Sequence, residues 1–173
     1  MLARLQALQG GGGGGELDLN ALAFRHGVTP LMHAVTGRHT NLVSQLLASG
    51  SDADAKNEAS WTALSLSAEA DCAISTLLLL QHGATVDLEV GGMLTALAVA
   101  AQSGGVEVCV ALLAAGAGVH CRDAVGYTPL MHACHFRRAG VARLLIAEGS
   151  DVNARDNWSA TPLSWAREGG PLD

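Results

Sequence analysis

Apolar and polar residues along this chain form a pattern that repeats every 33 residues. A Thr-x-Leu triplet marks each unit, and a pair of large apolar residues followed by a glycine keeps the same spacing. The triplets are Thr29-Pro30-Leu31, Thr62-Ala63-Leu64, Thr95-Ala96-Leu97, Thr128-Pro129-Leu130 and Thr161-Pro162-Leu163, and the glycines are Gly50, Gly83, Gly116 and Gly149. Several columns in phase over four periods predict a linear array of small units instead of one globular core.

Each unit carries the local signals of two short helices and a loop. The Thr hydroxyl can cap a helix N-terminus, and a proline directly after it suits the first helical position. In the first full unit, a first helix is therefore predicted over Leu31–Thr36 and a second helix over Asn41–Ser49. Gly50 ends the second helix because glycine adopts the left-handed conformation without a Cβ penalty. The loop that follows is rich in Asp, Asn and Gly, which predicts turn structure.

Neither helix of a unit is long enough to be stable alone in water. Each unit must therefore bury its apolar side against its neighbours. The leucines of the five triplets are expected to form one continuous buried column: Leu31, Leu64, Leu97, Leu130 and Leu163.

The first 28 residues follow the repeat only in part. Gly10–Gly15 has the composition of a flexible linker. Asp18–Ala21 resembles Asp151–Ala154, which precedes the last triplet. We interpret residues 1–28 as a degenerate half-repeat, with a disordered tail as the alternative.

The residues around the triplets resemble a known family. Thr-Pro-Leu-Met-His-Ala at 29–34 and at 128–133 resembles the ankyrin signature Thr-Pro-Leu-His-x-Ala, and Gly149–Ala154 is similar to the family's Gly-Ala-Asp-Val-Asn-Ala turn. The resemblance covers about residues 17–173. It implies an all-α solenoid in which antiparallel helix pairs stack side by side and hairpin-like fingers project from the turns.

The resemblance divides the chain into units and shows where the sequence departs from the family. After the half-repeat, the units are repeats over 29–61, 62–94, 95–127 and 128–160, and a truncated repeat over 161–173. The second repeat is the loosest. The signature His is displaced by one residue, to His33 and His132, which puts the hydrogen bond that the family makes from that His in question.

Charge and composition narrow the function classes. A net charge of −6 argues against nucleic acid, because phosphate binding needs a basic face. The cysteines show neither a repeat position nor a C-x-x-C spacing, so a disulfide framework is not expected. The sequence has no long apolar run free of charged residues, so it predicts no membrane span. We expect a soluble monomer in the cytoplasm or nucleus.

None of the candidate catalytic and metal-binding residues has the spacing that its chemistry requires. The best metal candidate is the group His120, Cys121, His132, Cys134 and His135. Its spacing is not that of a zinc finger, and its members occupy ordinary repeat positions. Ser65, Ser67 and Ser164 lack the strand-turn-helix context of a hydrolase nucleophile. Gly10–Gly15 lacks the Lys-Ser/Thr ending of a phosphate loop. The sequence therefore predicts no catalytic residue, no metal and no cofactor.

The family resemblance implies a partner that binds to the finger tips and the inner surface of the first helices. Four of the six aromatic residues fall at the variable positions of that surface, and aromatic residues are typical binding anchors. The predicted protein-binding residues are Trp61, Tyr127, His135, Phe136, Arg137 and Trp158. The alternative is that these aromatics pack along the fingers. Trp165 lies outside the set and is expected to pack at the truncated end.

The sequence thus predicts a non-catalytic protein–protein interaction module, a scaffold or adaptor that binds a protein or peptide. One alternative is a targeting segment of a larger enzyme, such as a ubiquitin ligase or a kinase. The other is a purely structural spacer.

Overall fold

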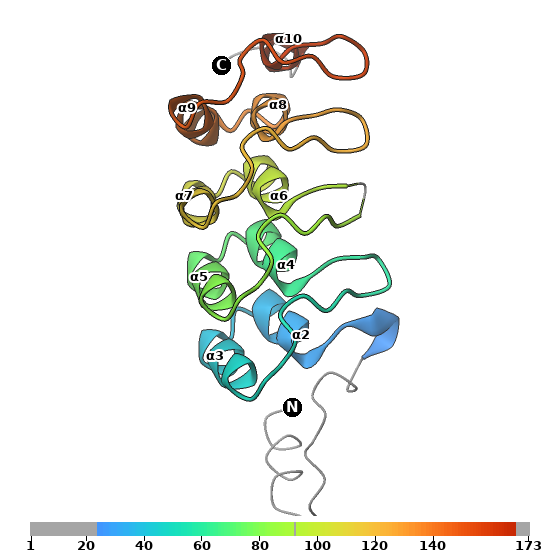
Figure 1. The fold of residues 1–173 in the computed structure, drawn as a ribbon, viewed down its shortest axis with the longest axis vertical. Coiled ribbons are helices and arrows are strands. Elements are labelled where there is room, and N and C mark those ends of the chain that lie inside the picture. Colours follow the sequence, from blue (N-terminus) through green and yellow to red (C-terminus); the bar gives the residue numbers. More distant parts are fainter. Residues whose placement is uncertain (1–23, 92, 169–173) are drawn as a thin grey trace, which may run out of the picture.

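The computed structural model describes residues 24–91 and 93–168, which form a one-dimensional stack of helix pairs (Figure 1). A 3-10 turn, η1 (Arg25–Gly27), precedes the pairs. The pairs are α2 (Pro30–Thr36) with α3 (Thr40–Ala48), α4 (Ala63–Glu69) with α5 (Ala73–Gln81), α6 (Ala96–Ser103) with α7 (Val106–Ala114), and α8 (Pro129–His135) with α9 (Ala139–Ala147). α10 (Pro162–Glu168) follows. The predicted all-α repeat solenoid is confirmed.

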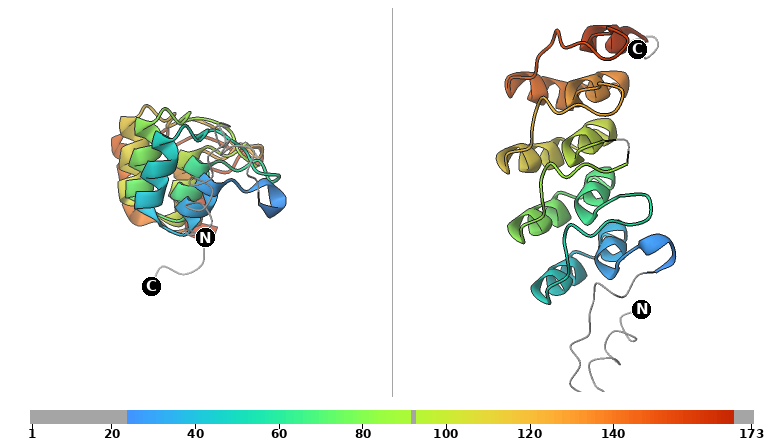
Figure 2. Two further views of the ribbon diagram at one scale, coloured as in Figure 1. Left: turned by 90° about the horizontal axis from the view of Figure 1, so that it is seen from below. Right: turned by 45° about the vertical axis from the view of Figure 1, so that its right-hand side comes forward.

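The helices form two layers, and the fingers project from one of them (Figures 1 and 2). The first helices, α2, α4, α6, α8 and α10, contact one another in sequence and form the inner layer. The second helices, α3, α5, α7 and α9, form the outer layer. The loops before each first helix extend away from the outer layer as a row of parallel fingers.

The Thr residues of the repeat cap the first helices, as the sequence predicts. Each Thr Oγ1 accepts a hydrogen bond from the backbone N–H three residues later, at 3.2–3.4 Å. The periodic glycines follow the second helices with φ of +82° to +91° at Gly50, Gly83, Gly116 and Gly149. A side chain at such a position would be strained, which explains the glycine column.

The described part of the loose second repeat keeps two backbone features of other units. Asp71 lies in the turn between α4 and α5 with φ +49°, close to the +55° of Arg38 and the +58° of Arg137 in the equivalent turns. In the following finger the Val90 N–H donates to the Leu94 carbonyl at 2.8 Å, as the Asn57 N–H does to the Trp61 carbonyl one unit earlier. The unusual sequence here therefore leaves these two features unchanged.

Polar contacts add to the packing between successive units. The Asp54 carboxylate accepts hydrogen bonds from the backbone N–H, at 2.8 Å, and the hydroxyl of Thr85. One unit later the Asp87 carboxylate accepts from the Gly118 N–H at 3.1 and 3.0 Å. These bonds join the loops after α3, α5 and α7 in succession.

The leucine column is buried at four of its five predicted positions. Leu31, Leu64, Leu97 and Leu130 are 0–2% exposed. The prediction is wrong for Leu163, which is 68% exposed on α10. Each buried leucine lies on a first helix that contacts the first helix of the next unit, and no described helix follows α10.

Some predictions fall on residues that the structure does not describe. Most of the half-repeat over 1–28, with its Gly10–Gly15 run, lies outside the described residues, and so does the end of the last unit, 169–173. Among the described helices, none has the length and apolarity to cross a membrane.

Replacing Leu97 by Ala is expected to lower the free energy of unfolding by roughly 2–5 kcal/mol, because removal of a fully buried side chain leaves a cavity. The matched control, Leu163→Ala, should change it by less than about 0.5 kcal/mol, because that side chain is already exposed to solvent. Urea unfolding followed by circular dichroism measures both. Equal losses would contradict the different environments of these two leucines.

Candidate functional site

The finger hairpins determine where the candidate binding residues lie. Each finger is closed by a backbone hydrogen bond that leads directly into the next first helix. The Asp123 N–H donates to the Tyr127 carbonyl at 3.1 Å, and the Asp156 N–H donates to the Ala160 carbonyl at 3.0 Å. Tyr127 and Trp158 are thereby held on short, closed loops.

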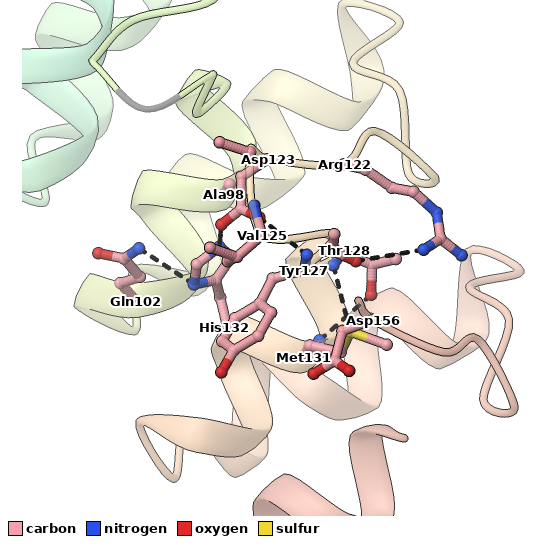
Figure 3. Close-up of polar contacts among 12 residues, drawn as sticks. Ala98, Gln102, Arg122, Asp123, Val125, Tyr127, Thr128, Met131, His132 and Asp156 are labelled. Carbon is pink, nitrogen blue, oxygen red and sulfur yellow. Dashed lines mark hydrogen bonds and ion pairs between the residues drawn. The ribbon is translucent and has the colours of Figure 1, made fainter. Parts of the chain in front are cut away.

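An aspartate side chain fixes each of the last two fingers from within. Asp123 Oδ1 accepts from the backbone N–H groups of Val125, at 3.0 Å, and Tyr127, at 2.8 Å (Figure 3). Asp156 Oδ1 accepts in the same way from Trp158 and Ala160, at 2.8 and 2.9 Å. Such a side chain substitutes for missing backbone partners in a turn, so the finger needs no partner protein to hold its shape.

The second oxygen of each aspartate binds a ring on the following first helix. Asp123 Oδ2 lies 3.0 Å from His132 Nε2 on α8. Asp156 Oδ2 accepts from Trp165 Nε1 on α10 at 2.8 Å. The two rings occupy equivalent positions, each nine residues after its aspartate. Finger and helix are therefore joined by one carboxylate in both units.

His132 also connects α8 to the preceding unit. Its Nδ1 lies 3.1 Å from Gln102 Nε2 on α6 (Figure 3). If Nε2–H donates to the Asp123 carboxylate, Nδ1 is left to accept from the Gln102 amide, which describes a neutral imidazole. Burial lowers the pKa of His132, while the neighbouring Asp123 carboxylate opposes this shift. Although His132 does not occupy the signature place, it forms a buried hydrogen bond.

Five rings, with Tyr127 at their centre, form what we call the aromatic patch: Tyr127, His135, Phe136, Trp158 and Trp165. Tyr127 is central, with its ring centroid 4.9 Å from that of Trp165, 6.2 Å from Trp158 and 6.4 Å from His135. His135 in turn contacts Phe136 and Trp165, at 4.9 and 5.2 Å. Phe136 is 45% exposed and Trp158 is 65% exposed. The patch thus combines rings that are fixed by contacts with one another and a large apolar surface that is exposed to solvent.

The structure brings four of the predicted binding residues into this patch and leaves two outside it. Tyr127, His135, Phe136 and Trp158 belong to it. Arg137 follows Phe136 in the exposed turn between α8 and α9. Trp61 lies on an earlier finger, half-buried and packed against the core. For Trp61 the geometry fits the alternative of packing along the fingers.

Trp165 is the patch residue that the repeat positions miss. It is half-buried, and its indole contacts Tyr127 and His135 and donates to Asp156. Its position on α10 corresponds to that of His132 on α8. A signal for it exists in the sequence, because an aspartate stands nine residues before each of them.

The candidate metal ligands named from the sequence do not come together in one site. Within residues 24–91 and 93–168, no group of three His, Cys, Asp or Glu side chains is arranged to hold a metal ion. Burial raises the pKa of the Cys134 thiol, and burial together with Asp87 and Glu89 raises that of Cys121. Both thiols are therefore poor sources of the thiolate that binds metals.

Fold and site together define a helix-pair solenoid that presents an aromatic surface on its fingers and inner helices. The family model for ankyrin repeats (three copies) matches residues 4–90, 78–156 and 97–173. The chain belongs to the ankyrin repeat family. Ankyrin repeats are generally protein–protein interaction modules and typically non-catalytic. No curated protein matches the chain.

Acidification is expected to destabilise the link between α6 and α8. Because burial lowers the pKa of His132 in the folded state, its contribution to stability is complete above the ordinary value of 6.5 and is lost as the pH falls through the folded-state pKa. Asp123 opposes the shift and His135 adds to it. Thermal unfolding of the wild type and of His132→Gln from about pH 8 to pH 5 measures the effect.

The wild type should lose more stability over this interval than His132→Gln, because glutamine does not titrate. All other histidines are common to both proteins, so their contributions cancel in the comparison apart from the electrostatic coupling of His135 with His132. Parallel losses in the two proteins would contradict the neutral, buried state of His132.

Proposed function

We propose that this protein is a non-catalytic scaffold or adaptor that binds a protein or peptide through the aromatic patch. The observation that carries the proposal is the exposure of Phe136 and Trp158 next to rings that are already fixed. Aromatic side chains bury large area at low entropic cost and dominate binding energy at interfaces. An isolated exposed aromatic needs no explanation, but a contiguous patch on the recognition side of the fold does.

Preorganisation supports the same proposal. The Trp158 backbone is fixed by Asp156, and the Trp165 indole by the same carboxylate. The Tyr127 backbone is fixed by Asp123. A partner that docks here orders few additional groups, and this reduces the entropic cost of association. Arg137, next to Phe136, adds a charged group at the rim of the proposed surface.

The environment of the cysteines supports a cytoplasmic or nuclear location within this proposal. Cys72, Cys109, Cys121 and Cys134 are free thiols, and burial raises the pKa of Cys109 to about 12. Free thiols suit a reducing compartment.

Trp158→Ala and Phe136→Ala are each expected to weaken binding to a captured partner by at least about 30-fold, the loss typical of a hot-spot residue. Affinity purification with mass spectrometry identifies the partner, and calorimetry with the purified partner gives the affinity. Circular dichroism checks that each variant is folded.

Ile74→Ala is the matched control, because Ile74 is 61% exposed on α5 in the outer layer. It should leave the affinity unchanged. If the patch variants bind as tightly as the wild type, or if Ile74→Ala loses as much as they do, the patch is not the binding surface.

A further inference from the structure

Two buried carboxylates lie directly behind the rings of the patch. Asp156 is 6% exposed and accepts the indole N–H of Trp165. The side chain of Asp123 is 7% exposed and bonds His132, whose ring packs 5.3 Å from that of Tyr127. A charge in such a poorly hydrated place is screened less than one in water, so its potential extends through the rings above it.

None of the donors that these carboxylates receive is a Lys or Arg side chain. Asp156 accepts from two backbone N–H groups and an indole, and Asp123 from two backbone N–H groups and the His132 imidazole, whose pKa burial lowers while Asp123 opposes this shift. The ion pairs among the described residues involve histidine and no Lys or Arg. Arg122, the neighbour of Asp123 in sequence, instead donates to the carbonyls of Gly126 and Arg155, at 3.3 and 2.6 Å.

We propose that the corner formed by Tyr127, Trp158 and Trp165 binds a lysine or arginine side chain of a partner peptide. The faces of these rings carry negative electrostatic potential and attract a cation. The indole N–H of Trp165 donates to a carboxylate, which makes its ring still more electron-rich. The two carboxylates add a fixed negative charge, which attracts a cationic side chain but not a neutral one. This inference rests on the proposed binding function of the patch.

Arginines lie at both ends of the patch, and none is paired with the two carboxylates among the described residues. Arg137 and Arg138 lie beyond the C-terminal end of α8, next to Phe136, and Arg138 Nε donates to the Gln102 carbonyl at 2.8 Å. In the fingers, Arg155 donates to the Ser159 carbonyl at 3.1 Å, as Arg122 does to backbone carbonyls. These donating guanidinium groups therefore bind main-chain oxygens and leave the Asp123 and Asp156 carboxylates to the backbone and ring donors around them.

The test uses the full chain and a phage-displayed library of random peptides. Selected peptides that no longer bind Trp158→Ala are synthesised, and each of their arginines is replaced by citrulline and each lysine by norleucine. One such replacement is expected to weaken binding by roughly 5- to 30-fold in calorimetry, as for a partly desolvated cation–π contact. The same replacements show whether lysine or arginine is preferred.

Variants of the protein separate charge from apolar contact. Asp123→Asn with Asp156→Asn removes both charges, and Asn57 shows that an asparagine can close a finger, because its Oδ1 accepts from the Ala59 and Trp61 N–H groups. Because Asp156→Asn also removes the acceptor of the Trp165 indole N–H, the affinity for the neutral peptide is measured as well. This double variant should lose the preference for the charged peptide over its neutral counterpart and keep the affinity for the neutral one. The control Glu107→Gln removes one charge on α7 in the outer layer. This variant should keep the preference for the charged peptide.

Each further outcome has a defined meaning. Peptides that need Trp158 but bind equally well with citrulline or norleucine would overturn the cation site and leave the proposed binding function standing. A library in which no selected peptide depends on Trp158 would overturn both. Loss of the charge preference in Glu107→Gln would assign it to the net charge of the protein and overturn the local site.

Discussion

Lateral packing between units is the constraint on which every other feature of this protein depends. α2 has seven residues and α3 has nine, and helices of this length are not stable alone in water. They persist because each first helix contacts the next one along the stack and buries a leucine there. Leu163, exposed on α10, shows how much of this burial comes from the following unit. Because each unit depends on its neighbours alone, residues that face away from them are free to vary.

The candidate site uses that freedom at two fixed positions of the unit. One lies in the finger and the other nine residues later on the first helix, and the fold brings their side chains together. In the first unit the pair is Phe24 and His33, whose rings are 5.6 Å apart. In the last two units it is an aspartate with His132 or with Trp165. The same two positions thus form a contact between two rings in one unit and a buried polar contact in others.

Much of the fold could be predicted from the sequence, because the information is local and repeated. The Thr caps and the left-handed glycines depend on residues within one unit, and each occurs several times in the same phase. The exposure of Leu163 could not be predicted from the local pattern, because the burial of this side chain depends on a neighbouring unit and not on its own.

The candidate site could be predicted in part, for a related reason. Position within the unit indicated Tyr127, His135, Phe136 and Trp158, but it treats all fingers alike. It therefore included Trp61, which packs against the core, and it missed Trp165, whose place is set by a hydrogen bond to Asp156. The bond between His132 and Gln102 joins two units and has no counterpart in the local pattern.

The aspartates show how a structural requirement can create a chemical property of the surface. Closing a finger does not require a charge, since Asn57 makes the same two backbone bonds as Asp156. The charge is required by the ring donor on the helix, because the amide nitrogen of asparagine cannot accept the Trp165 indole N–H, whereas the second carboxylate oxygen can. Burying a carboxylate is costly unless its acceptor sites are satisfied, and three neutral donors satisfy Asp156 without neutralising it. The negative charge behind the aromatic patch is therefore a direct consequence of how the last two fingers are attached to their helices.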